Sequence, residues 1–219
     1  MKNNKVEWFY PEWASNALFN KPFIVRDTDS ALGRYNLSIK EISLKDLARI
    51  HGHLCDGLVI SYIALRAGFE CLFPDGIVDR TDLRVVSKNG PCWIDAAALM
   101  TGARINFKTL RVDAAMGEGF ILQKTSSGQA CRVKLKNGVF PADMKELEST
   151  IRKSRQMGEP VSAKQIDQIE KMHDDFSKKL LNTDPEQILD IELLEDYLFH
   201  FNDLFGDRGD VINKDMPRK

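Results

Sequence analysis

The sequence lacks the features of several specialised protein classes. Its 31 basic and 32 acidic residues nearly balance, so the formal net charge is −1 and no positive excess favours a nucleic-acid partner. The longest apolar stretches, such as Leu58 to Leu65, are far shorter than the roughly 20 residues of a membrane-spanning helix. The sequence therefore predicts neither binding to nucleic acid nor association with a membrane.

Cysteine is scarce, and the N-terminus has no apolar leader. Four cysteines, namely Cys55, Cys71, Cys92 and Cys131, are too few for a disulfide scaffold in 219 residues. The first eleven residues mix Lys, Asn, Glu and aromatics, so we expect no secretory signal and a cytoplasmic location. Reduced thiols near histidines are candidate metal ligands in that compartment. Cys71 and Cys131 lie in apolar runs, where cysteine behaves as a small hydrophobe.

The composition is that of a globular protein, with 43% hydrophobic and 29% charged residues. The pattern predicts an α+β fold, in which an antiparallel sheet packs with helices and a C-terminal helical segment follows. Four segments are expected: an N-terminal arm at 1–40 packed on the body, a metal-binding α+β domain at 41–142, a helical extension at 143–210 and a polar tail at 211–219.

The central segment carries helix and strand signals in turn. Ser43 and Asp46 resemble a helix N-cap with an acidic first turn. Helices are expected from about Leu44, through the apolar run up to Cys71, and from Cys92 to Met100. Strands that form an antiparallel meander are expected at 83–87, 105–112, 119–124 and 129–135.

Helical signals dominate after Asp143. The first segment runs to Arg155, and a capping box of Ser162 with Gln165 opens the second. Asp184 and Pro185 are expected to open a last helix whose apolar positions are Ile188, Ile191, Leu194, Leu198 and Phe201. The last two helices could pair as a hairpin, dock on the body or supply a dimer contact.

Two imidazoles and a thiol fall within five residues, at His51, His53 and Cys55. Such borderline-soft donors suit zinc and, with less preference, nickel, copper or iron. His51 and Cys55 share a face if the segment is helical, and all three donors share a side if it is extended. A lone histidine on an apolar face is more often a core residue, and short patterns have false positives. The density of donors nevertheless favours a transition-metal site.

Cys92 is expected in the first turn of the helix that Pro91 opens, where the positive helix end favours a thiolate. It would complete the site as a distant ligand. Asp95, one turn further on, could be a ligand itself or could orient a histidine. His173 and His200 lie in the C-terminal segment without a cysteine nearby, and we interpret them as packing or surface residues unless another protomer uses them as ligands.

Two blocks of the sequence resemble one protein family. Residues 51–58, His-Gly-His-Leu-Cys-Asp-Gly-Leu, resemble the His-Gly-His-x-Cys-Pro-Gly signature of the FmdE family, which is named after a component of formylmethanofuran dehydrogenase. Residues 92–96, Cys-Trp-Ile-Asp-Ala, with Thr101 and Gly102 after them, resemble its second block, Cys-x-x-Asp-Ala followed by Thr-Gly-Cys. The resemblance covers about Leu44 to Val139.

This resemblance implies an α+β fold, a bound metal that is usually zinc, and a homodimer. Carried over by position, the ligands would be His53, Cys55 and Cys92, with His51 as a fourth ligand or an immediate neighbour. Three protein ligands and an open position are typical of a catalytic zinc.

The chain also departs from the family pattern. Asp56 stands where the family usually has Pro, and Ala103 stands where it has a second Cys. Many members carry a C-terminal zinc ribbon built from Cys-x-x-Cys pairs, whereas this sequence has no cysteine after Cys131. Any role of that second thiol or of the ribbon is therefore not expected here.

Three functions fit these residues. The first is a metal-dependent enzyme or an accessory subunit in one-carbon or formate-type metabolism, with Asp95 or the non-ligating histidine moving a proton. A small anionic substrate could then be held by Arg84, Lys88 and Arg104, although such residues are more often solvated surface charges. The alternative is a non-catalytic metal carrier, sensor or cofactor-insertion factor. The third is a thiol redox protein that uses Cys55 and Cys92.

Overall fold

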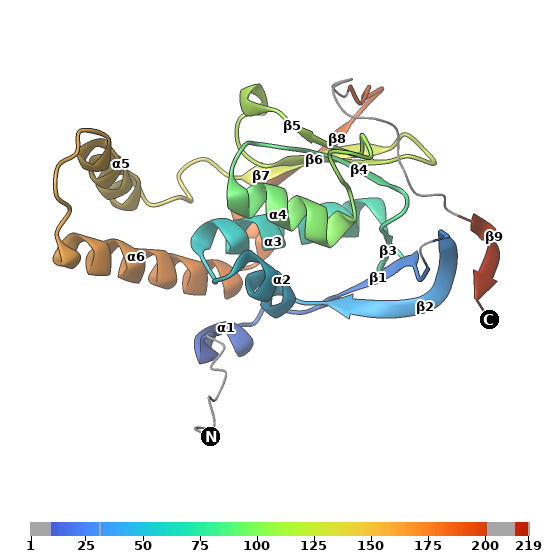
Figure 1. Ribbon diagram of the computed structural model, residues 1–219, viewed down its shortest axis with the longest axis horizontal. Coiled ribbons are helices and arrows are strands. Elements are labelled where there is room, and N and C mark those ends of the chain that lie inside the picture. The colour runs from blue at the N-terminus through green and yellow to red at the C-terminus, as the bar shows by residue number, and fades with distance from the viewer. Residues whose placement is uncertain (1–9, 31, 201–212, 219) are drawn as a thin grey trace.

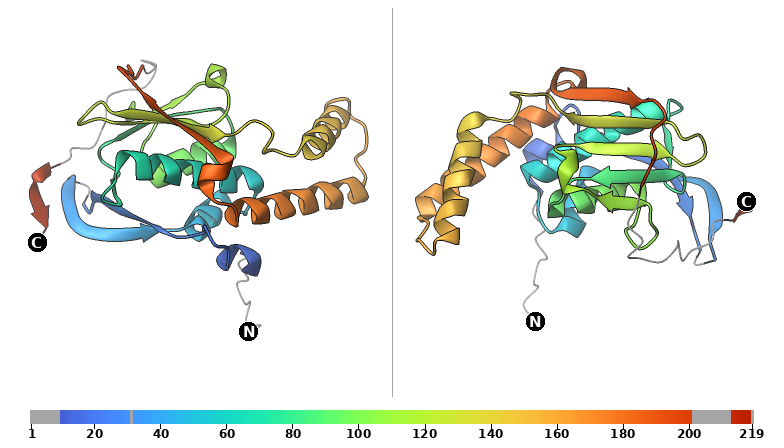
Figure 2. Two further views of the ribbon diagram at one scale, coloured as in Figure 1. Left: turned by 180° about the vertical axis from the view of Figure 1, so that it is seen from behind. Right: turned by 90° about the horizontal axis from the view of Figure 1, so that it is seen from above.

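Two sheets enclose a layer of helices in the computed structural model, which describes residues 10–30, 32–200 and 213–218. Helices α3 (Asp56–Leu72) and α4 (Pro91–Thr101) lie beneath the larger sheet, and the smaller sheet lies on the opposite side of α3 (Figures 1 and 2). The α+β class expected from the sequence is therefore confirmed.

The larger sheet has five strands in the order β5-β4-β6-β7-β8. Its strands are β4 (Leu83–Ser87), β5 (Leu110–Val112), β6 (Phe120–Lys124), β7 (Ala130–Leu135) and β8 (Leu189–Leu194). Neighbouring strands run antiparallel except β4 and β5, which run parallel. The expected meander is thus correct for the middle of the sheet and wrong for β5. The expected strand at 105–112 is confined to its last three residues, because Lys108 adopts a positive φ of 55° and turns the chain before them.

The smaller sheet has the order β3-β1-β2-β9. Its strands are β1 (Phe23–Thr28), β2 (Arg34–Ile42), β3 (Ile77–Asp79) and β9 (Asn213–Arg218). Strands β1 and β2 pair antiparallel, whereas β3 and β9 each run parallel to their neighbour. Strand β1 packs closely on the helical layer, where the Phe23 ring lies 6.2 Å from that of Tyr62 and 5.3 Å from that of Phe69.

Helix α3 forms the centre of the molecule. Leu58, Val59, Tyr62, Ala64 and Leu65 are fully buried along it, because sheets cover it on two sides and α4 and α6 (Ala163–Leu181) on others. Its apolar composition on all faces is what such a position requires. The helix thereby fixes the direction of its own N-terminus, where the functional residues lie.

The C-terminal segment projects from this body. Helices α5 (Ala142–Gln156) and α6 form a hairpin that extends away from both sheets, and α6 returns to α3 at its other end (Figure 1). The predicted capping box of Ser162 and Gln165 opens α6. No helix in the described ranges is both long enough and apolar enough to cross a membrane.

Three local predictions were wrong. The arm at 1–40 was expected to be irregular, but it contributes α1 (Glu12–Ser15), β1 and β2, since Phe23 and Val25 alternate into the core. The last helix ends after one turn as α7 (Pro185–Ile188), and Leu189–Leu194 pairs with β7 instead. The spacing of Ile188, Ile191 and Leu194 fits a helix, but the backbone groups of β7 offer a ladder that a local pattern does not reveal.

The polar tail at 211–219 was expected to fray. Its residues Asn213–Arg218 instead form β9 beside β2, with Arg34 opposite Asn213. Leu198 lies outside any helix or strand, and Phe201 falls outside the described residues. The division of the chain into four segments stays a prediction.

Candidate metal centre

A sharp turn between α2 (Leu44–His51) and α3 positions two of the expected donors. The predicted N-cap opens α2 as a full capping box between Ser43 and Asp46. The helix ends at His51, because Gly52 adopts a left-handed φ of 101° that side chains other than glycine rarely accept. Three residues later Cys55 is the N-cap of α3. The turn thus brings the last residue of one helix back to the first residue of the next.

The third donor comes from the start of α4. Gly90 is the N-cap, Pro91 is the first helical residue, and Cys92 follows in the first turn, as the sequence predicted. A Cβ atom added to Gly57 would lie only 3.1 Å from the Cys92 sulfur. Gly57 therefore allows the starts of α3 and α4 to approach closely enough for their sulfurs to meet.

The three donors converge on one point. The Sγ atoms of Cys55 and Cys92 lie 3.4 Å apart, and the Cys55 Sγ lies 3.9 Å from Nε2 of His51. All three ligand atoms lie within 4.8 Å of one another, and each residue is half-buried. Two thiolates on a tetrahedral zinc ion with bonds of about 2.3 Å would be about 3.7 Å apart, so this donor set fits such an ion with small adjustments.

Asp95 holds the imidazole in position. Its Oδ2 lies 2.8 Å from Nδ1 of His51, and the His51 side chain is only 5% exposed. A carboxylate on Nδ1 fixes the proton there and leaves Nε2 free to act as an acceptor or ligand towards the sulfurs. Of the two roles that the sequence left open for Asp95, the geometry matches the orienting one.

His53 lies beside this group rather than in it. Its ring centroid is 4.7 Å from that of His51, and the residue is exposed. Among the described residues, the group of donors within mutual reach contains His51, Cys55 and Cys92. Position in the motif alone pointed to His53 first; the turn at Gly52 instead points His51 at the thiols.

The two thiols share one proton unequally. A hydrogen bond from Cys55 lowers the pKa of Cys92 to about 6, with a further contribution from His51. The same hydrogen bond, together with burial, raises the pKa of Cys55. In the metal-free pair at neutral pH, Cys92 is therefore the thiolate and Cys55 the thiol. A divalent cation would have to displace the remaining proton.

The cations considered for substrate binding have other partners. Lys88 pairs with Glu118 and lies 4.1 Å from the centre of the Trp93 ring. Arg104 donates to the carbonyls of Ala98 and Ala103, and Arg84 lies over the Phe199 ring. None of these contacts points to an anion site at the thiols.

Ala103, where the family has a second cysteine, follows the other end of α4. Eleven helical residues separate the two ends of that helix, which corresponds to about 16 Å. Ala103 is buried, with 1% of its surface exposed. The substitution therefore leaves the donor set at Cys92 intact.

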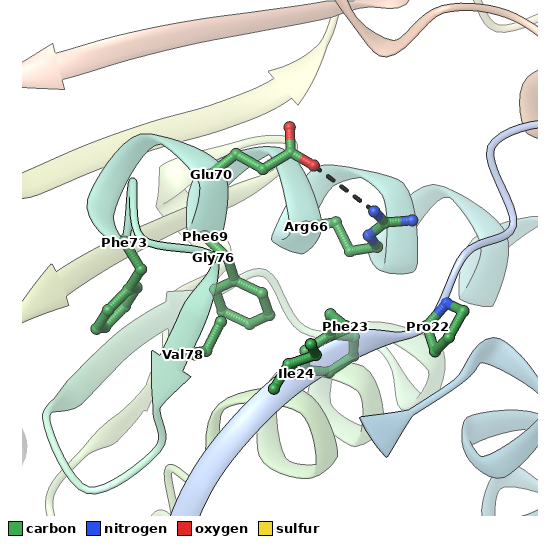
Figure 3. A pocket seen from close by; sticks show the side chains of 9 residues that line it. All are labelled: Pro22, Phe23, Ile24, Arg66, Phe69, Glu70, Phe73, Gly76 and Val78. Carbon is green, nitrogen blue, oxygen red and sulfur yellow. Dashed lines mark ion pairs between the residues drawn. The ribbon is translucent and has the colours of Figure 1, made fainter. Parts of the chain in front are cut away.

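The best-formed cavities lie elsewhere. A cavity of about 220 Å³ lies between β1 and the C-terminal half of α3, lined by Phe23, Phe69 and Phe73 with the Arg66–Glu70 ion pair at its edge (Figure 3). Phe69 lies fourteen residues along α3 from Cys55, a separation of roughly 20 Å. This cavity does not open onto the thiols.

Some relevant residues escaped the sequence analysis. Gly57 carried the helix-start interpretation only, although a small residue two positions after a candidate ligand is a usable signal of close approach. His173 was interpreted as a packing or surface residue, whereas it lies between the carboxylates of Asp56 and Glu148. No local pattern links residues so far apart in the chain.

The fold and the site together define an α+β protein with a half-buried imidazole and dithiol group at the junction of three helices. The family model described as "FmdE, Molybdenum formylmethanofuran dehydrogenase operon" matches residues 50–190, more than half of the chain. The protein belongs to the FmdE family. The match extends beyond the region of resemblance at 44–139 and includes α5 and α6.

A solved structure is also similar. It is the crystal structure of an FmdE-like protein of tungsten formylmethanofuran dehydrogenase from Syntrophus aciditrophicus, with 18% sequence identity and a TM-score of 0.41. The similarity covers 74% of this chain and 76% of that one. No curated protein matches the sequence.

Proposed function

We propose that this protein binds a transition-metal ion, zinc (Zn²⁺) in the first place, through His51, Cys55 and Cys92. The observation that carries the proposal is the convergence of these three donor atoms within 4.8 Å. Three protein ligands leave a fourth position for water, a substrate or His53. Nickel or iron would also accept this set of one nitrogen and two sulfurs.

The surroundings favour a reactive site over a purely structural one. A structural zinc has four protein ligands, whereas three converge here and the fourth candidate, His53, is exposed. When bound, the ion would polarise a carbonyl or activate a water molecule. Asp95 orients His51 and stabilises positive charge on it, and His53 is placed to move a proton at the edge of the site.

We therefore infer a metal-dependent enzyme or an accessory subunit in one-carbon or formate-type metabolism, acting on a small anionic substrate in the cytoplasm. Membership of the family supports this inference. A non-catalytic carrier, sensor or cofactor-insertion factor would use the same ligands. The rate of metal exchange separates the two, because a carrier releases its ion to a competing chelator within minutes and an enzyme retains it.

The thiol pair supports a redox function as the competing proposal. Sulfurs 3.4 Å apart need little movement to form a disulfide, and the depressed pKa of Cys92 supplies a thiolate at neutral pH. A reducing and an oxidising treatment of the metal-free protein, followed by mass spectrometry of trapped thiols, would reveal a reversible Cys55–Cys92 disulfide. Metal bound at isolation would favour the first proposal instead.

We further propose a homodimer. Two exposed apolar side chains of the edge strand β8, Ile191 and Leu193, with 44% and 59% of their surface exposed, support a contact there. Light scattering coupled to size exclusion would give the mass in solution. A Leu193→Lys variant that stays dimeric would place the contact elsewhere, and a monomeric wild type would contradict the proposal.

Metal content is the decisive measurement for the proposed site. Protein purified without added metal would be compared with a Cys55→Ser, Cys92→Ser double variant by elemental analysis. Cys71→Ser is the matched control, since Cys71 is a partly buried thiol at the far end of α3. We expect the wild type and the control to carry one ion per chain and the double variant almost none. Equal content in all three would refute the site.

A further inference from the structure

One histidine and two carboxylates meet on three helices beside the first centre. Asp56 begins α3, Glu148 lies on α5 and His173 on α6. The ligand atoms that they offer lie within 4.8 Å of one another, and all three residues are half-buried. Since the three residues come from such different parts of the chain, the packing of the α5–α6 hairpin on α3 alone creates this group.

Both ring nitrogens of His173 face a carboxylate. Nε2 lies 2.8 Å from Oε1 of Glu148, and Nδ1 lies 3.7 Å from Oδ1 of Asp56. Ligand atoms around a divalent cation with bonds of about 2.1 Å are roughly 3.0 to 3.4 Å apart, and the two observed distances bracket that range. Side-chain rotation is enough to turn these atoms towards one ion.

The group carries uncompensated negative charge. With neutral His173 its formal charge is that of two carboxylates, whose side chains are only 14% exposed for Asp56 and 29% for Glu148. Within the described part of the chain, each carboxylate has His173 as its ion-pair partner and neither has a Lys or Arg within 4.0 Å. Half-buried carboxylates without a basic partner are costly unless a cation neutralises them.

We propose that Asp56, Glu148 and His173 form a second divalent-cation site, separate from the thiols. One imidazole and two carboxylates are the donors that Mn²⁺ and Fe²⁺ prefer, whereas the thiolate pair prefers softer ions. The two centres therefore select different metals. This site stands whether or not the thiol centre holds zinc.

The position of the site gives the ion a structural consequence. Asp56 directly follows Cys55, so an ion here would tie the α5–α6 hairpin to the residue next to a ligand of the first centre. Asp56 is the residue that replaces the family's usual proline, and proline has no ligand atom to offer. The departure from the family motif thus supplies one of the three donors.

Electron paramagnetic resonance of Mn²⁺ tests the proposal, because free and bound Mn²⁺ give different spectra. The full chain would be titrated with MnCl₂ as wild type and as Glu148→Gln and His173→Gln variants. We expect one bound ion in the wild type and affinity at least about tenfold weaker in each variant, by analogy with the loss of supporting groups in metal sites. Glu146→Gln and Glu170→Gln are matched controls, since both residues are exposed and lie on the same two helices.

The Cys55→Ser, Cys92→Ser variant separates the two centres. It should bind Mn²⁺ as the wild type does, and its loss of Mn²⁺ would assign the ion to the thiols and overturn the proposal. Wild-type protein that binds no Mn²⁺, or site variants that bind it equally well, would overturn it too. Circular dichroism of each variant shows whether the fold is kept, and the Asp56→Pro variant offers a second way to remove a ligand. If a variant unfolds, the result rests on the other two.

Discussion

Asp95 on α4 accepts a hydrogen bond from the imidazole of His51 on α2 at 2.8 Å, across 44 residues of sequence. The pair links the ends of two helices through the site itself. It orients the His51 ring so that Nε2 faces the thiols. This relationship makes Asp95 a positioning residue whose effect is measurable apart from chemistry.

Asp95→Asn should weaken zinc binding by about 10- to 100-fold, because the amide keeps the shape of the side chain but loses the charge that stabilises His51 as a ligand. Competition with a chromogenic chelator measures this affinity. Asp167→Asn, an exposed substitution on α6, is the control. Unchanged affinity in Asp95→Asn would remove the orienting role.

His51→Ala and His53→Ala separate the two histidines of the motif. His51 faces the thiols and is 5% exposed at its side chain, whereas His53 is exposed beside it. We expect His51→Ala to lose most bound metal and His53→Ala to retain it while changing any proton-transfer rate. The same elemental analysis used for the cysteines reports the result. The reverse order would show that His53 is the ligand.

Two glycines of α3 give a paired test of close approach. An added Cβ would lie 3.1 Å from the Cys92 Sγ at Gly57 and 2.8 Å from Leu122 Cδ1 at Gly68. Each overpacking should cost about 1 to 3 kcal/mol, partly offset by a gain of about 1 kcal/mol in helix propensity. We expect Gly57→Ala to weaken metal binding and Gly68→Ala to lower only the melting temperature. Equal metal affinity in both variants would contradict the role of Gly57.

The thiol pair predicts a pH profile for alkylation of the chelator-treated protein. Because the pKa of Cys92 is lowered to about 6, its thiolate is present above that pH and is lost as the pH falls through it. Iodoacetamide should therefore modify Cys92 with a midpoint near pH 6. In Cys55→Ser the weaker hydroxyl donor replaces the thiol, so the midpoint should rise. A wild-type midpoint near that of an ordinary thiol would contradict the shared proton.

The same shift has a consequence for stability. A group whose pKa is depressed on folding stabilises the folded state above its unfolded pKa, and this contribution is lost as the pH falls through the folded value. The metal-free protein should thus lose part of its stability as the pH falls from about 9 to about 6. Urea unfolding of the wild type and of Cys92→Ser at both pH values would measure it, and the variant should show the smaller change.

Local signals determined the helices that build the first centre. The Ser43 capping box, the Gly52 stop and Pro91 at a helix start are features of a few consecutive residues, so each could be predicted from the sequence. Strands β4, β6 and β7 followed from apolar runs between turns. The donors His51, Cys55 and Cys92 were named for the same reason, because metal-binding chemistry depends on residue type and spacing.

Tertiary structure decided what depends on pairing between distant segments. Strand β8 exists because β7 offers it a ladder, although its apolar spacing fits a helix. The turn at Gly52 and the packing of α2 on α4 decided that His51, not His53, meets the thiols and Asp95. The group of Asp56, Glu148 and His173 arises only when α5 and α6 pack against the start of α3. Sequence determined which side chains can bind a metal; the packing of helices decided which of them share one ion, because only packing sets the distances between donors.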